Sequence, residues 1–168
     1  LNYIADITVN GHPETVNRPK PPSELKSARA PAVKSESGYG TRNLLDEKGP
    51  KAVATWMLEQ NRLLLTDTTM RDGHQSLLAT RMRSLDMINA APFYSSKLPK
   101  LFSIECWGGA TFDVAYRFLQ ECPWQRLRDI RATMPNIMTQ MLLRASNGVG
   151  YTNYPDNVVE AFVREAAK

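Results

Sequence analysis

Side chains that can do chemistry gather in three short segments, each of which directly follows an apolar run. They are residues 66–76 (TDTTMRDGHQS), residues 105–111 (ECWGGAT) followed by Asp113, and residues 144–156 (RASNGVGYTNYPD). A carboxylate such as that of Asp72 is a hard oxygen ligand that suits a divalent cation. The guanidinium of Arg144 offers a planar fork of donors that matches a carboxylate. These segments are therefore rich in groups that bind metals and carboxylic acids.

The first segment also allows a simpler interpretation. Asp67 and Asp72 can cap the loop by accepting hydrogen bonds from their own backbone, as aspartate often does. A single histidine such as His74 is more often a hydrogen-bonded orienter than a metal ligand. Composition alone leaves both interpretations open for this segment.

The second and third segments have alternatives of the same kind. Gly108-Gly109 lets the backbone pass close to a ligand or makes a tight turn, and composition favours the turn. The guanidinium of Arg144 either binds a carboxylate ligand or forms a salt bridge with Glu105 or Asp113 on the neighbouring segment. The residue types do not decide between these roles.

The elements that position these segments follow a repeating order of strand, loop and helix. Apolar runs begin at residues 63, 101 and 137, and each leads through a polar loop into a helical pattern. Pro155 fits the first turn of the third helix, Thr111 is a candidate cap for the second, and Pro123 is expected to end it. This order predicts an α/β fold of parallel strands joined by crossover helices. Reactive groups of such folds collect at the carboxyl ends of the strands, where all three segments lie.

The residues before the first repeat fall into three stretches. Residues 3–9 alternate apolar and polar side chains and predict a strand. Residues 17–40 concentrate Pro, Lys, Ser and Gly, which predicts a linker because so little apolar surface cannot offset the entropy of ordering. Residues 41–62 predict one or two short helices broken at Gly49-Pro50.

Composition excludes several classes of protein. The net charge of +4 is modest and evenly spread over the 168 residues, with no basic stripe interleaved with aromatics, so nucleic acid is not an expected partner. The longest uncharged stretches fall far short of the ~20 apolar residues of a membrane-spanning helix. Two cysteines are too few for a disulfide scaffold and indicate reduced thiols.

Four runs of sequence carry a resemblance to a known family. Residues 67–83 (DTTMRDGHQSLLATRMR) resemble the signature of the biotin-dependent carboxyltransferases, and residues 105–128 (ECWGGATFDVAYRFLQECPWQRLR) narrow this to pyruvate carboxylase, oxaloacetate decarboxylase and transcarboxylase. Residues 141–159 (MLLRASNGVGYTNYPDNVV) and 3–22 (YIADITVNGHPETVNRPKPP) favour the pyruvate carboxylase family. The resemblance covers essentially the whole chain.

This resemblance implies a fold and a reaction. The fold is the first three βα units of a TIM (β/α)8 barrel, preceded by a strand, a Pro-rich linker and short helices. Residues 1–40 would be a connecting segment similar to the allosteric and linking region, residues 41–62 the lead-in helices, and residues 63–168 the start of the carboxyltransferase barrel. The reaction is transfer of a carboxyl group from carboxybiotin to pyruvate, which gives oxaloacetate.

Matching the family's motifs residue by residue implies the site. Asp72 would bind a divalent metal, Zn or Mn, while Gln75 and Arg144 would hold pyruvate. Asp113 and Tyr151 would support the biotin and substrate site, and Arg71 would orient the network. These roles come from the resemblance alone.

The family's remaining parts lie outside this sequence, among them the other metal ligands, the biotin-carrying domain and the domain that uses ATP and Mg. We therefore expect the 168 residues alone to be inactive. The family also implies a homo-oligomer, specifically a tetramer, in the cytoplasm or, in a eukaryote, the mitochondrial matrix. Two alternatives remain: a non-catalytic linking or assembly fragment, and a decarboxylase α-subunit, which the leading segment disfavours.

Overall fold

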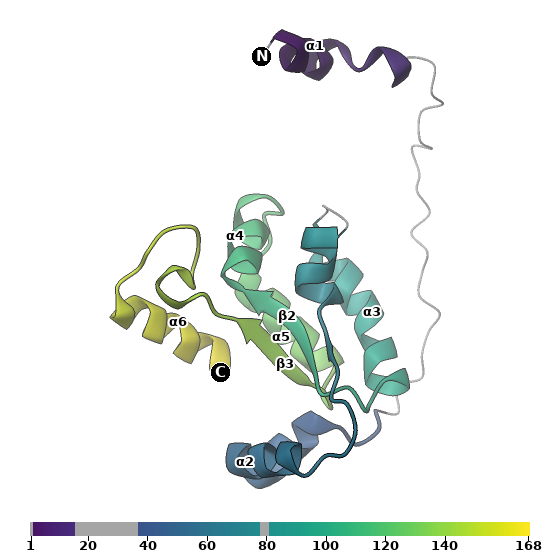
Figure 1. The fold of residues 1–168 in the computed structure, drawn as a ribbon, viewed down its shortest axis with the longest axis vertical. Helices are drawn as coiled ribbons and strands as arrows, with labels where there is room; N and C mark the ends of the chain where they lie inside the picture. The colour runs from purple at the N-terminus through teal and green to yellow at the C-terminus, as the bar shows by residue number, and fades with distance from the viewer. Residues whose placement is uncertain (1, 16–36, 78–80) are drawn as a thin grey trace.

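The computed structural model describes residues 2–15, 37–77 and 81–168. Figure 1 shows a small sheet of parallel strands with helices packed around it. The elements are α1 (Asn2–Asn10), η1 (Pro13–Thr15), α2 (Thr41–Leu58), β1 (Thr66–Asp67), η2 (Thr69–Leu77), α3 (Ser84–Lys97), β2 (Ser103–Gly108), α4 (Gly109–Arg117), α5 (Pro123–Thr133), β3 (Met138–Leu142), η3 (Ala145–Asn147) and α6 (Asp156–Ala167).

The sheet has the strand order β1-β2-β3, and both pairs are parallel. Thr66 pairs with Ser103 across the first pair, and Ser103 pairs with Met138 across the second. A bulge between Glu105 and Trp107 shifts the register of the second pair. Every residue of the central strand β2 is buried, as expected for a parallel strand covered on both faces. The predicted α/β fold with parallel strands is confirmed.

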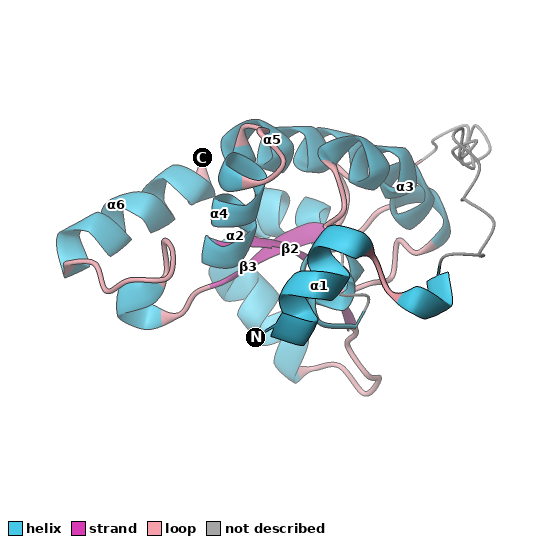
Figure 2. Cartoon of the chain, turned by 90° about the horizontal axis from the view of Figure 1, so that it is seen from above, coloured by secondary structure: helices cyan, strands magenta, loops and turns pink. Residues whose placement is uncertain are grey.

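The apolar core lies between the sheet and the helices. Helices α3 and α5 pack side by side over one face (Figures 1 and 2). Each fully buried aliphatic or aromatic side chain contributes about 1.5–3 kcal/mol relative to an exposed one. The buried cluster comprises Met70, Met87, Ala91, Ile104, Cys106, Trp107, Leu127, Ile130, Met134, Ile137 and Phe162.

Trp107 anchors an aromatic group at the edge of this core. Its ring stacks on Phe162 with centroids 5.2 Å apart, and it lies 5.0 Å from the ring of Trp124. Its indole N–H donates to the carbonyl oxygen of Pro123 at 3.0 Å, so the buried polar atom is satisfied. This group ties β2 to α5 and α6.

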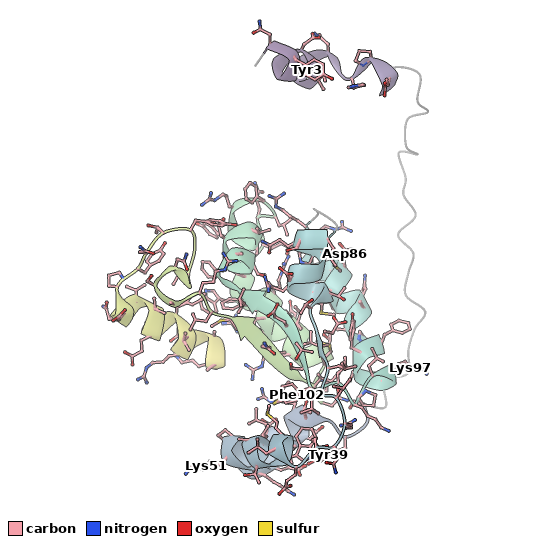
Figure 3. All side chains as sticks on the ribbon, viewed as in Figure 1. Tyr3, Tyr39, Lys51, Asp86, Lys97 and Phe102 are labelled. Carbon is pink, nitrogen blue, oxygen red and sulfur yellow. The ribbon has the colours of Figure 1, made fainter. Side chains whose placement is uncertain are left out.

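Helix α2 covers the amino-terminal ends of the strands. The hydroxyl of Thr41 donates to the carbonyl of Phe102 at 2.8 Å and accepts from the backbone N–H of Met138 at 3.2 Å. Figure 3 shows Phe102 and Tyr39 beside this helix. Gly49, with φ 77°, interrupts the helix just before Pro50, which confirms the predicted break. The opposite end of the sheet is left open for a site.

The charges on α3 complement its dipole. Asp86 lies in its first turn and Lys97 in its last, at opposite ends of the helix in Figure 3. The side chain of Asp86 accepts the backbone N–H of Arg83 at 3.2 Å and also binds its guanidinium. These bonds lower the pKa of Asp86, chiefly through the side-chain bond to Arg83. The polar groups therefore fix where the helix begins.

The strand predicted for residues 3–9 is wrong, because Asn2–Asn10 form helix α1. Alternation of apolar and polar residues indicates a strand only where a partner strand accepts its backbone hydrogen bonds. A helix satisfies those groups within itself, and the amide of Asn10 adds a bond of 2.6 Å to Asp6. Of the linker predicted for residues 17–40, residues 17–36 lie outside the described part of the chain.

Boundaries in the repeats also need correction. The strand predicted at residues 63–65 is instead β1 at Thr66–Asp67, and the side chain of Leu63 is 86% exposed. Thr111 lies inside α4 rather than at its cap. Pro123 begins α5 instead of ending α4, because a proline suits the first helical turn, where its missing N–H needs no partner. The strand predicted at residues 137–143 is confirmed as β3, and the helix after Pro155 as α6.

Candidate functional site

A cavity of about 130 Å³ lies at the carboxyl ends of the three strands. Its wall includes Gly108 at the end of β2 and Leu142 at the end of β3. Five of the six site residues suggested by the sequence also line it: Arg71, Asp72, Gln75, Arg144 and Tyr151. Parallel strands bring these distant segments together because all their carboxyl ends lie at one edge of the sheet.

The first segment is shaped by the turn η2, a π-helix. The carboxylate of Asp67 accepts the backbone N–H of Thr69 at 2.9 Å and so caps the start of the turn. The backbone N–H of Gly73 donates to the carbonyl of Thr68 at 2.8 Å. Asp67 is therefore the loop cap that its residue type suggested, and the turn after it carries the cavity residues.

Asp72 faces the cavity with one oxygen already engaged. Its Oδ1 accepts a hydrogen bond from Arg71 Nη1 at 3.0 Å and another from the hydroxyl of Ser76 at 2.8 Å. Within the described residues no hydrogen bond reaches its Oδ2. The side chain is 43% exposed, so a ligand can approach the carboxylate.

Arg71 bridges this carboxylate to the sheet. Its Nε donates to Glu105 Oε1 at 2.7 Å, and its Nη2 forms an ion pair with the same oxygen. Both side chains are buried, with 10% and 8% exposed. A buried pair of this kind is costly to break, because each partner would be left as an uncompensated charge. The geometry gives Arg71 a fixed guanidinium between β2 and Asp72.

Arg144 leaves the end of β3 with its guanidinium exposed. In the described part of the chain it forms no salt bridge with Glu105, which pairs with Arg71, or with Asp113, which pairs with Arg117. The salt-bridge interpretation of Arg144 is therefore wrong. The cation remains on the cavity wall, available to an anionic ligand.

The backbone of the third segment passes very close to the start of α4. A Cβ added at Gly109 would lie 2.3 Å from the carbonyl oxygen of Gly148. A residue larger than glycine cannot occupy this position without a backbone shift. The Gly-Gly pair thus serves close packing of the segment that carries Arg144 and Tyr151, rather than the simple turn favoured by composition.

Asp113 is the one suggested site residue that the cavity does not include. It lies in α4, where its Oδ1 is 2.8 Å from Nη2 of Arg117. Its Oδ2 is buried and has no hydrogen-bond partner in the described structure. Asp113 therefore does not line the cavity that the other five residues share.

His74 lies behind the first cavity. Its Nε2 is 3.2 Å from the carbonyl oxygen of Met70, and the backbone N–H of Met82 points to Nδ1 at 3.5 Å. It lines a second cavity of about 280 Å³, which shares Gln75 and Tyr151 with the first. These contacts match the orienter interpretation.

The sequence did not single out Ser76 and Glu105 as site residues. Ser76 follows Asp72 by four positions, a spacing that brings side chains together on a helix. Glu105 is the charged residue of the buried strand β2, and a charge within such a strand is the available signal for a buried ion pair.

A metal ion would find only part of a site here. Among the described residues there is no group of three or more His, Cys, Asp or Glu side chains that could hold one. The free Oδ2 of Asp72 is a hard oxygen donor that fits a divalent cation as one ligand of several.

No helix in the described ranges is long and apolar enough to cross a membrane.

The fold and the site define the class of this protein: an α/β protein with parallel strands and a polar, charged cavity at their carboxyl ends. Comparison with known proteins identifies its relatives within this class. No family model matches the chain. It is 57% identical over 171 residues to pyruvate carboxylase of Staphylococcus aureus, covering 100% of this chain and 15% of that protein. It is 48% identical over 166 residues to mitochondrial pyruvate carboxylase of Mus musculus, covering 99% of this chain and 14% of that protein.

Solved structures give the same result. The carboxyl transferase domain from Rhizobium etli pyruvate carboxylase matches with TM-score 0.79 and 61% identity, over 98% of this chain and 28% of that one. The complete multifunctional enzyme from Rhizobium etli matches with TM-score 0.81 and 60% identity, over 98% of this chain and 15% of that one. The chain is therefore strongly homologous to pyruvate carboxylase and corresponds to part of its carboxyl transferase region. It spans about 15% of the length of these curated relatives.

Proposed function

We propose that this chain is part of a biotin-dependent pyruvate carboxylase and helps to transfer a carboxyl group from carboxybiotin to pyruvate, which gives oxaloacetate. The single observation that carries the proposal is the cavity at the strand ends. The residues that line it include the cation of Arg144 and the carboxylate of Asp72. Structures of the Rhizobium etli domain with pyruvate, and with pyruvate and biocytin, support this choice of ligands.

Arg144 and Gln75 would bind pyruvate. The guanidinium of Arg144 matches the planar carboxylate of pyruvate, and charge-assisted hydrogen bonds of this type are the strong ones. Gln75 also lines this cavity, and its amide supplies a donor and an acceptor. Together they would orient the methyl group of pyruvate for loss of a proton.

Arg71, Tyr151 and Asp113 would support the reaction without holding the substrate carboxylate. Arg71 orders Asp72 through its hydrogen bond of 3.0 Å. Tyr151 lines both cavities and would contact the biotin or the substrate from the third segment. Asp113 would contribute a buried carboxylate oxygen that has no partner among the described residues.

Asp72 would be one ligand of a divalent cation, Zn or Mn, and the other ligands would come from parts of the full-length enzyme outside this sequence. A bound divalent cation stabilises negative charge that develops on a substrate oxygen. Biotin would arrive on a separate domain, and ATP with Mg would be used by another. The assembled protein would be a homo-oligomer, a tetramer by resemblance, in the cytoplasm or the mitochondrial matrix.

The same proposal covers the architecture. Residues 63–168 would form the first three βα units of an eight-unit barrel, after a connecting segment at 1–40 and lead-in helices at 41–62. The sequential order of three parallel strands supports this, because each barrel strand pairs with the one before it. The site at the carboxyl ends of the strands is where barrel enzymes carry out their chemistry.

The experiment that tests the proposal is Arg144→Ala in a full-length pyruvate carboxylase that carries this sequence. Loss of a charged hydrogen-bond pair costs about 1.5–3 kcal/mol, so KM for pyruvate should rise about 10- to 150-fold. Arg128→Ala is the matched control, because Arg128 is an exposed arginine on α5 outside the cavity. An unchanged KM for pyruvate in Arg144→Ala would show that this arginine does not bind the substrate.

A further inference from the structure

We propose that Ser76 and Glu105 are positioning residues for Asp72, which hold one oxygen of its carboxylate so that the other is presented to the cation. This inference rests on the proposed function, because it takes Asp72 as a ligand of the divalent metal. It assigns a role in metal binding to two residues that would not themselves touch the metal.

Ser76 acts directly on the carboxylate. Its hydroxyl donates to Asp72 Oδ1 at 2.8 Å from four residues further along η2. The side chain of Ser76 is exposed and lines the cavity, so the core does not require it. Its hydrogen bond therefore serves the position of Asp72 rather than the packing of the fold.

Glu105 acts through Arg71. The guanidinium donates from one edge to Glu105 Oε1, with Nε at 2.7 Å, and from Nη1 to Asp72 Oδ1 at 3.0 Å. Glu105 is buried in the central strand β2, which is the most enclosed part of the sheet. The rigid strand thus sets the position of Arg71, and Arg71 sets the position of Asp72.

Both donors converge on the same oxygen. Oδ1 accepts from Arg71 and from Ser76, whereas in the described part of the chain Oδ2 accepts no hydrogen bond. A carboxylate that is fixed at one oxygen loses less rotational freedom when its other oxygen binds a metal. The lone pairs of that second oxygen are not engaged in a hydrogen bond that the metal would first have to displace. Residues that orient a ligand in this way typically contribute 10- to 100-fold to metal affinity.

Mn²⁺ titration of the metal-free, full-length enzyme tests the inference, with free Mn²⁺ measured by electron paramagnetic resonance. Ser76→Ala should weaken Mn²⁺ binding at least about tenfold, and Ser76→Thr, which keeps the hydroxyl, should restore it. Glu105→Gln keeps the size of the side chain but removes its charge, and should weaken binding in the same direction. Circular dichroism checks that each variant is folded.

Two matched controls separate positioning from general stability. Ser96→Ala removes a hydroxyl that bonds to the carbonyl of Pro92 within α3. Glu121→Gln disrupts the ion pair between Glu121 and Arg126. Like Arg71, Arg126 is a buried arginine, but this pair lies outside the first cavity. Both controls should bind Mn²⁺ as the unsubstituted enzyme does.

The outcomes distinguish this inference from the proposed function. If Asp72→Asn abolishes Mn²⁺ binding while Ser76→Ala and Glu105→Gln bind normally, Asp72 is a ligand but the positioning role is wrong. If Asp72→Asn itself binds Mn²⁺ normally, the proposed ligand fails and the positioning role fails with it. Loss of affinity in all three variants, with rescue by Ser76→Thr, supports both.

Discussion

The side-chain amide of Asn136 donates a hydrogen bond of 2.7 Å to the backbone carbonyl of Gly38, 98 residues earlier in the chain. The same amide donates to the carbonyl of Ser95 at 2.9 Å, and its oxygen accepts the hydroxyl of Ser95 at 2.7 Å. Asn136 is 2% exposed, so no solvent substitutes for these partners. One side chain therefore joins the start of β3, the end of α3 and the segment before α2.

Replacing Asn136 by alanine should loosen this junction. The change leaves the buried hydroxyl and carbonyl of Ser95 without their partner, at a cost of about 1–3 kcal/mol. Amide hydrogen exchange of peptides around residues 38–42 and 136–139 in the full-length enzyme should speed up at least about fivefold. Asn157→Ala, at an exposed position on α6, should leave these rates unchanged. Equal rates in both variants would contradict a structural role for Asn136.

Gly109→Ala should damage the cavity. The added Cβ would meet the carbonyl of Gly148 at 2.3 Å, and this backbone must shift together with the segment that bears Arg144 and Tyr151. Carboxylation of pyruvate should fall by at least about tenfold, since displacements of about 1 Å at a site can cost about 100-fold. Gly150→Ala is the control, because its Cβ would make only an ordinary contact of 3.9 Å. Steady-state kinetics of both variants decide the matter.

The two cysteines should differ sharply in reactivity. Burial, with a contribution from the nearby Glu105 carboxylate, raises the pKa of the Cys106 thiol to about 12. Only the thiolate is nucleophilic, so native Cys106 should resist iodoacetamide at pH 8. Cys122 is exposed and should be modified first. Peptide mass spectrometry before and after unfolding measures both sites, and rapid labelling of native Cys106 would contradict its burial.

The charge of Glu121 should make the stability of the fold depend on pH in the acidic range. Burial raises the pKa of Glu121, but hydrogen bonds from Ser84 and the guanidinium of Arg126 outweigh it and hold the pKa below its usual value of 4.5. A lowered pKa in the folded state means that the stabilisation is present above the unfolded pKa and is lost as the pH falls through the folded one.

Calorimetry of Glu121→Gln between pH 3 and pH 7 measures this effect. The Tm gap to the unsubstituted enzyme should be open at neutral pH and should close as the pH falls below about 4.5. The control is Glu160→Gln, which removes an exposed ion pair with Arg164 on α6 and should shift Tm little at any pH. A gap that does not vary with pH would contradict a charge effect at Glu121.

The sequence predicted the parallel strands and the place of the cavity. Both depend on the order of the strands and helices along the chain rather than on the residues at which each element begins and ends. β3 and α6 were located closely, since a long apolar run and Pro155 mark them. β1 was misplaced because Leu63 is apolar yet exposed, and residue type alone does not report burial. The helix α1 was missed because alternation says nothing about whether a partner strand exists.

The site was predictable to the extent that strand ends determine it. Arg144 lies two residues after β3 and Asp72 lies five residues after β1, inside η2, and the parallel sheet brings both to one cavity. Asp113 lies as far after β2 as Asp72 lies after β1, but inside α4, where it does not line the cavity. The four-residue spacing of Asp72 and Ser76 and the charge of Glu105 in a buried strand are sequence signals, but neither identifies the partner that η2 and β2 provide.

The neighbour order of the sheet has a consequence for synthesis. Because β1, β2 and β3 pair in the order in which the chain is made, each strand can dock on its predecessor as it leaves the ribosome. Contacts between nearby segments form quickly. The junction at Gly38 must wait, since its partner is made 98 residues later. Helix α2 is thus translated before the three strands, and the segment in front of it is fixed only after Asn136 has been made.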